Sequence, residues 1–154
     1  MTMQRSLGSF LLISAVINLT ASPGAFALSN SSLTITINGL KNQRGQVCLS
    51  VFSGGRGFPS SSDRAVAARC VKLENAPLTV KFENLKSGNY AIAAYHDANN
   101  DGILNRNLLG IPTEQFGFSQ NPKILTGPPK FGDCAVLVAG PQTNIQIQLL
   151  NFLG

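Results

Sequence analysis

Apolar and polar residues alternate with a period of two over much of the chain. The run Leu33-Thr34-Ile35-Thr36-Ile37-Asn38 places three aliphatic side chains on one face, which is typical of a half-buried β-strand. The same pattern predicts further strands near residues 46–52, 70–73, 78–82, 89–96, 134–138 and 143–150. Seven short strands separated by glycine, proline and asparagine indicate an all-β, antiparallel sandwich.

Two of these strands also indicate which of their faces are buried. In the last one, Ile145, Ile147 and Leu149 point inward and the residues between them are polar. The strand from Tyr90 to Tyr95 instead carries alanine and isoleucine on both faces. That composition favours a central position in a sheet that is covered on each side.

One short helix is predicted over residues 60–68, where serine and aspartate precede the run Arg64-Ala65-Val66-Ala67-Ala68 in the order expected at a helix start. The segment from Leu108 to Lys130 is rich in proline and glycine, so we predict an irregular conformation there. A stretch of this length in a small domain often serves a function or packs over a sandwich edge.

Three aromatic residues fall in or next to this irregular segment: Phe116, Phe118 and Phe131. They would either line a surface groove or fasten the loops onto the sandwich. Packing is the favoured interpretation, because exposed aromatic patches are uncommon without a partner.

The first 27 residues have the three parts of a secretory signal peptide. Arg5 gives a basic start, the apolar run extends from Leu7 to Leu19, and Ala25-Phe26-Ala27 is a small-residue cleavage site. We therefore expect a signal peptide at 1–27 and a single β-sandwich domain at 28–154, in the periplasm or secreted. No later apolar run approaches the roughly 20 residues that a membrane-spanning helix needs, so no transmembrane segment is expected after cleavage.

The charge of the chain argues against nucleic acid as a partner. Without Arg5 the 12 basic residues become 11 against 7 acidic ones, so the net charge falls from +5 to +4. The basic residues stand singly, without the clustered stripe that follows a phosphate backbone. An anionic envelope component or a polysaccharide is the kind of partner that remains.

Three cysteines lie after the predicted cleavage site, in a compartment that permits disulfides. Three pairings can be drawn, and strand parity favours Cys48 with Cys70, since both point away from the apolar faces of their strands. Cys134 is then a free thiol. No basic activator stands beside it in the sequence, so we interpret it as a small core residue and not as a nucleophile.

The segment from His96 to Asn107 carries the strongest chemical pattern. Counted from Asp97, aspartate or asparagine oxygens occupy the first, third and fifth places of a calcium-binding loop, and glycine the sixth. The twelfth place holds Leu108 instead of the bidentate glutamate of an EF-hand, so weak calcium binding is expected. The candidate ligands are Asp97, Asn99, Asp101, Asn105 and Glu114.

A simpler interpretation of the same residues is an Asx-rich turn that bonds its own backbone and binds no ion. Calcium is the one cofactor expected, and the two interpretations stay open from the sequence. A zinc site is not indicated, because the single histidine and the three cysteines lack any metal-binding spacing.

His96 is the only histidine, so a histidine-dependent mechanism would have to pass through it. No GxSxG sequence accompanies it, and we interpret it as a hydrogen-bonded histidine at the end of a buried strand. The alternative function is an envelope-associated hydrolase that uses His96 with Asp97 or Glu114. The favoured function is a non-enzymatic binding or structural module of the cell envelope.

Several segments resemble an uncharacterised bacterial family of secreted proteins, the domain of unknown function DUF2141. The resemblance is carried by residues 96–102 together with residues 110–119, and by 38–40, 45–47 and 82–91 earlier in the chain. It implies an exported sandwich of the immunoglobulin-like or transthyretin-like kind with no assigned activity. Residues 82–90 also resemble the strand-turn-strand of carboxypeptidase regulatory domains, which mostly act as accessory or adhesion units.

Overall fold

Two sheets form a sandwich in the computed structural model, which describes residues 30–152 apart from 75 and 126. The first sheet has the order β4-β1-β8, with β4 at Leu78–Leu85, β1 at Ser31–Asn38 and β8 at Thr143–Gln148. The second has the order β3-β2-β5-β6, and β7 also pairs with β5. These strands are β3 (Ala67–Lys72), β2 (Gln46–Phe52), β5 (Gly88–Asp97), β6 (Phe116–Phe118) and β7 (Val136–Val138). The predicted signal peptide at 1–27 lies outside the described residues.

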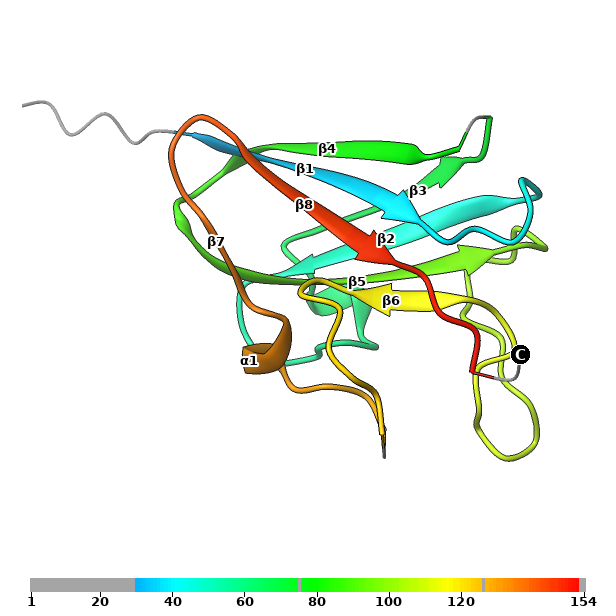
Figure 1. Cartoon of the computed structure of the whole chain (residues 1–154). Helices are drawn as coiled ribbons and strands as arrows, with labels where there is room; N and C mark the ends of the chain where they lie inside the picture. Colours follow the sequence, from blue (N-terminus) through cyan, green and yellow to red (C-terminus); the bar gives the residue numbers. More distant parts are fainter. Residues whose placement is uncertain (1–29, 75, 126, 153–154) are drawn as a thin grey trace, which may run out of the picture.

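The main core lies between the two sheets (Figure 1). It is built from the inward side chains that the alternation predicts, including Leu33, Ile35 and Ile37 of β1 and Ile147 of β8, all without exposed surface. Burial of such aliphatic side chains is the main favourable term in folding. The predicted fold class, an all-β sandwich, is confirmed.

The strand count and one pairing differ from the prediction. The described residues contain eight strands, because Phe116–Phe118 forms β6 within the segment predicted to be irregular. β1 pairs with β4 antiparallel but with β8 parallel. Alternation shows which face of a strand is buried, but it does not show whether the neighbouring strand runs parallel or antiparallel. The parallel pair could therefore not be predicted from the pattern.

The predicted helix at 60–68 is wrong in extent. Only Ser62–Arg64 forms a helical turn, of the 3-10 type (η1), and β3 already begins at Ala67. Ala67 and Ala68, at the end of this segment, pair instead with Val51 and Ser50 of β2, which satisfies their backbone better than one isolated helical turn would. A four-residue helix instead occurs at Phe131–Cys134 (α1), so the strand predicted from 134 begins at Val136.

A second, smaller core covers the outer face of the five-stranded sheet. Ala91 of β5, Phe116 and Phe118 of β6 and Cys134 of α1 are buried there, with Phe58 and Phe131 packed against them. The aromatic residues therefore pack onto the sandwich, as favoured, and Phe116 and Phe118 also line a hollow on this face. β5 is covered on both faces, as its composition predicts.

A disulfide joins Cys48 of β2 to Cys70 of β3, which is the pairing that strand parity favours. The two cysteines are direct partners in the antiparallel register of these strands. Cys134 is free and fully buried. Within the described part of the chain, no helix is long and apolar enough to cross a membrane.

The buried Cys134 thiol is expected to be unreactive in the folded protein. Burial and, to a smaller extent, the neighbouring Asp133 carboxylate raise the pKa of Cys134 to about 11, so almost no thiolate exists near neutral pH. Iodoacetamide at about pH 8 should leave the native protein unmodified by mass spectrometry and add one group in denaturant without reductant. Equal modification of native and denatured protein would contradict this assignment.

Candidate functional site: the loop after strand β5

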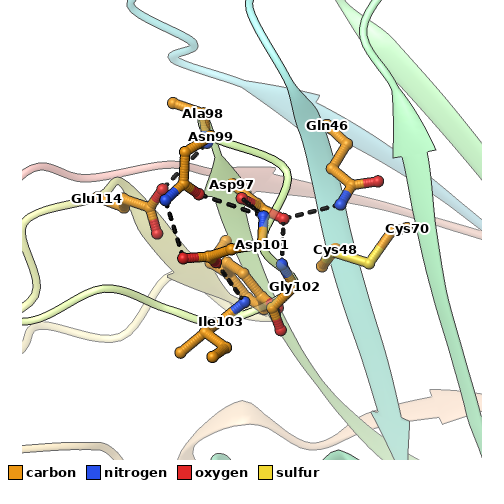
Figure 2. Close-up of a disulfide and its surroundings, with 11 residues drawn as sticks. Gln46, Cys48, Cys70, Asp97, Ala98, Asn99, Asp101, Gly102, Ile103 and Glu114 are labelled. Carbon is orange, nitrogen blue, oxygen red and sulfur yellow. Dashed lines mark hydrogen bonds between the residues drawn. A yellow bond between two sulfur atoms is a disulfide. The ribbon is translucent and has the colours of Figure 1, made fainter.

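The loop that leaves β5 starts from a buried carboxylate. Asp97 has no exposed surface, and its Oδ1 accepts the backbone N–H of Asp101 at 3.1 Å. Its Oδ2 accepts the backbone N–H of Gly102 at 2.8 Å and the side-chain amide of Gln46 at 2.7 Å (Figure 2). A buried carboxylate is costly unless it is hydrogen-bonded in this way. Asp97 therefore ties the loop to β2.

Asp101 forms the second centre of the loop. Its Oδ1 accepts the backbone N–H of Ile103 at 2.8 Å, and its Oδ2 accepts the side-chain amides of Asn99 at 2.8 Å and Asn105 at 3.0 Å. The hydrogen bond from Asn105 is the main cause that lowers the pKa of Asp101, followed by those from Ile103 and Asn99. These donors hold the carboxylate ionised.

Glu114 closes the loop from its far end. Its Oε1 accepts the backbone N–H of Ala98 at 3.0 Å, and its Oε2 accepts that of Asn105 at 3.0 Å. Glu114, two residues before β6, thus joins the start of the loop to its middle. A bidentate clamp of this kind fixes the loop geometry without any ion.

The sequence-predicted ligands lie together, and their oxygens are largely used by the protein itself. Asp97, Asn99, Asp101, Asn105 and Glu114 all belong to this one hydrogen-bonded loop. Among the described residues, no three histidine, cysteine, aspartate or glutamate side chains form a group that could hold a metal ion. Calcium would therefore rely on asparagine and backbone oxygens as well as carboxylates.

His96 faces the opposite side of β5 from Asp97, because neighbouring residues in a strand alternate between faces. Its side chain is 3% exposed, and its Nε2 lies 2.7 Å from the backbone oxygen of Arg44. A carbonyl oxygen only accepts, so Nε2 carries the proton. The interpretation of His96 as a buried, hydrogen-bonded histidine is confirmed.

Tyr95 adds a further contact to the loop, which no motif in the sequence predicts. Its hydroxyl donates to the backbone oxygen of Gly102 at 2.7 Å. Burial raises the pKa of Tyr95, and the negative charges of Asp97, Glu114 and Asp101 raise it further, so the hydroxyl stays protonated as a donor.

The outermost part of the loop is a tight turn that exposes two leucines. The Oδ1 of Asn107 accepts the backbone N–H groups of Leu109 and Ile111, both at 3.0 Å, and the guanidinium of Arg106 donates to the backbone oxygen of Gly110 at 2.9 Å. Leu108 is 106% exposed and Leu109 83%. We call residues 107–110 the loop tip.

Replacing Asp97 by asparagine should destabilise the fold. The asparagine amide carries one oxygen and one donor group, so at least one of the three N–H groups now facing Asp97 would lose its acceptor. We expect Asp97→Asn to lower the free energy of unfolding by about 2 kcal/mol or more, measured by urea denaturation. Asp63→Asn, in the exposed η1 turn, is the control. Equal stability of both variants would refute the anchoring role of Asp97.

Comparison with known proteins adds the family. The model of the family described as "Uncharacterized protein conserved in bacteria (DUF2141)" matches residues 35–146, from β1 to β8 and including the whole loop. No curated protein and no solved structure was found to match the chain. The resemblance noted in the sequence is thereby confirmed: the chain belongs to the DUF2141 family of uncharacterised bacterial proteins.

Proposed function

We propose that this protein is an exported, non-enzymatic module that binds the surface of the cell envelope through the loop at residues 97–112. The observation that carries the proposal is the loop tip, where Leu108 and Leu109 are almost fully exposed on a turn with its own hydrogen bonds. Turns at a protein surface usually carry polar residues, and an exposed apolar feature often marks an interaction site.

The support beneath the tip favours a binding role. Asp97, Asp101 and Glu114 each accept at least two hydrogen bonds from the loop, so the leucines stand on a preorganised scaffold. A loop that is already ordered loses little conformational entropy when it binds. Two leucines that are held in a fixed position can insert a short distance into the apolar layer of a membrane.

Charge makes an anionic lipid surface the preferred envelope component. Arg106 flanks the tip, whereas the loop's carboxylates, Asp97, Asp101 and Glu114, accept hydrogen bonds from donors within the loop. The expected mature chain carries a net charge of +4. Each basic residue near an anionic lipid surface adds about 1 kcal/mol of attraction. The two exposed leucine side chains of the tip offer apolar contact and no hydrogen-bonding group, so they fit lipid better than a polysaccharide.

The non-enzymatic part of the proposal is supported by the surroundings of His96. Its Nε2 is engaged by the Arg44 backbone, and Asp97 lies on the other face of the strand. Glu114 is engaged by two backbone N–H groups. Turnover of an ester, peptide or glycan that is abolished by His96→Ala would overturn this part.

Calcium enters the proposal as a weak stabilising ion for the same loop. Five side chains of the donor types that calcium accepts gather there, and the amides of Asn99 and Asn105 would present oxygens after a half-turn about their terminal bonds. The ion would replace hydrogen bonds that already exist, which is consistent with modest affinity.

Membrane binding is tested by sedimentation with vesicles that contain phosphatidylglycerol. The wild type should sediment with them, and the double variant Leu108→Ser, Leu109→Ser should show at least about tenfold weaker partitioning, because each leucine contributes roughly 1.5–3 kcal/mol on burial. Leu137→Ser is the matched control, since Leu137 is an exposed leucine on β7. Equal sedimentation of all three proteins, or binding to isolated polysaccharide but not to vesicles, would contradict the proposal.

Calcium binding is tested by thermal denaturation in millimolar calcium and in chelator. We expect the melting temperature of the wild type to rise with calcium, and that of Asp101→Ala to be insensitive to it, because that substitution removes a central carboxylate. Asp133→Ala, at the distant helix α1, is the control and should respond like the wild type. Identical melting of the wild type with and without calcium would remove the ion from the proposal.

A further inference from the structure

An apolar cavity of about 680 Å³ lies against the outer face of the five-stranded sheet. The loop at 98–115 and the segment that follows β6 both extend on this side of the sheet, away from β4, β1 and β8 (Figure 1). Residues from both contribute to the lining, as do Pro59 and Ser60 after β2. The volume falls within the range of about 300–1,000 Å³ that is usual for small-molecule sites.

The register of the strands explains why the sheet is hollow here. Ser50 of β2 pairs with Ala68 of β3 on one side and with Ala93 of β5 on the other, so three small outward side chains stand in a row across three strands. Ala93 in turn pairs with Phe118 of β6, whose ring bounds the row. Larger side chains at the three positions would fill the space, so the hollow is built by the sequence.

The walls of the cavity are apolar. The parallel row beside the small residues contains the Cys48–Cys70 disulfide, Tyr95 and Phe116. Leu104, Ile111 and Ile124 line the cavity from the two loops. Ile103 and Phe152, both part of the lining, remain 63% and 48% exposed, which leaves apolar surface at the opening without a partner in the described chain.

The charges on the lining have one sign. Among the described residues that line the cavity, Arg69 and Arg106 are the charged ones, and no aspartate or glutamate lines it. Arg69 is already engaged, because its guanidinium stacks on the Phe82 ring at 5.3 Å and donates to the backbone oxygen of Lys81. Arg106 is exposed and uses one nitrogen for Gly110, so its remaining N–H groups can meet an anion.

We infer that this cavity binds an anionic amphiphile with one hydrocarbon chain, of the fatty-acid class. The hydrocarbon chain occupies the hollow over Ser50, Ala68 and Ala93, and the carboxylate or phosphate at its end contacts Arg106. The site adjoins the loop tip, since Gly110 lines the cavity, but the two exposed leucines Leu108 and Leu109 do not line it. Binding of this kind combines burial of apolar area with one charge-assisted contact at the rim.

The chain-binding part is tested with cis-parinaric acid, a fluorescent fatty acid, and with variants that fill the hollow. Ala93→Leu and Ala68→Phe should each weaken binding of the acid at least tenfold and leave the melting temperature of the ligand-free protein equal or higher, because they fill empty apolar space. Ala68→Phe lies at an exposed position of an edge strand, so it keeps the test valid if Ala93→Leu disturbs the fold. Ala139→Leu, on an exposed alanine outside the cavity lining, is the control and should bind like the wild type.

The head-group part is tested by comparing the acid with its uncharged methyl ester. Arg106→Gln should weaken binding of the acid about fivefold, as expected for an exposed ion pair, and leave binding of the ester unchanged. Lys123→Gln, a change of equal charge outside the cavity lining, should affect neither. Absence of saturable binding by the wild type, or unchanged binding by both filling variants, would overturn the cavity assignment. Equal affinity of wild type and Arg106→Gln for the acid would overturn the head-group assignment.

The source of the ligand is distinguished by incubation with phosphatidylglycerol vesicles that contain lysophosphatidylglycerol, an anionic lipid with one hydrocarbon chain, followed by separation and mass spectrometry of lipid bound to the protein. Transfer of the lysolipid to the wild type but not to Ala68→Phe assigns a membrane lipid. Binding of free fatty acid without transfer assigns the free acid, and both results support the cavity as the site. The variant with serine at both tip leucines should still bind cis-parinaric acid, so failure of vesicle binding leaves this test intact.

Discussion

The structure depends on strand β5 being covered on both of its faces. Ile92 and Ala94 contribute to the core between the sheets, and Ala91 and Ala93 face the smaller core under β6 and α1. A strand that is buried on both sides needs a second layer of chain over the sheet. Parts of the loops at 98–115 and 119–130 provide this second layer.

The end of β5 determines what the first loop can do. Asp97 is the last residue of the strand and is buried on its outer side, where three N–H groups replace the water that its carboxylate loses. These hydrogen bonds hold the start of the loop against β2. This satisfied network limits the gain that calcium can add, and it also explains how two leucines are held in solvent on a well-defined turn.

The register of the paired strands in the five-stranded sheet produces both the second core and the cavity. Where β6 places Phe116 and Phe118, the outer face is filled, and where β2 and β3 place Ser50 and Ala68, it is left hollow. Protein interiors are normally densely packed, so an unfilled apolar hollow does not stabilise the fold. A hollow that is lined by apolar atoms and open to solvent is typical of a ligand site. A binding role for this face therefore rests on the arrangement of side-chain sizes along paired strands.

From the amino-acid sequence alone one can predict the sandwich, the inward residues of its strands, the two-sided burial of β5 and the pairing of Cys48 with Cys70. These properties follow from local periodicity, because side chains alternate strictly along a strand. The sequence also gathered Asp97, Asn99, Asp101, Asn105 and Glu114 into one predicted site and left open whether their oxygens bind calcium or the loop's own N–H groups, which take many of them in the folded chain. The parallel pairing of β1 with β8, the strand β6 and the cavity arise only from the tertiary fold. These depend on which strands become neighbours and in what register, and contacts between residues far apart in the chain leave no periodic signal in it.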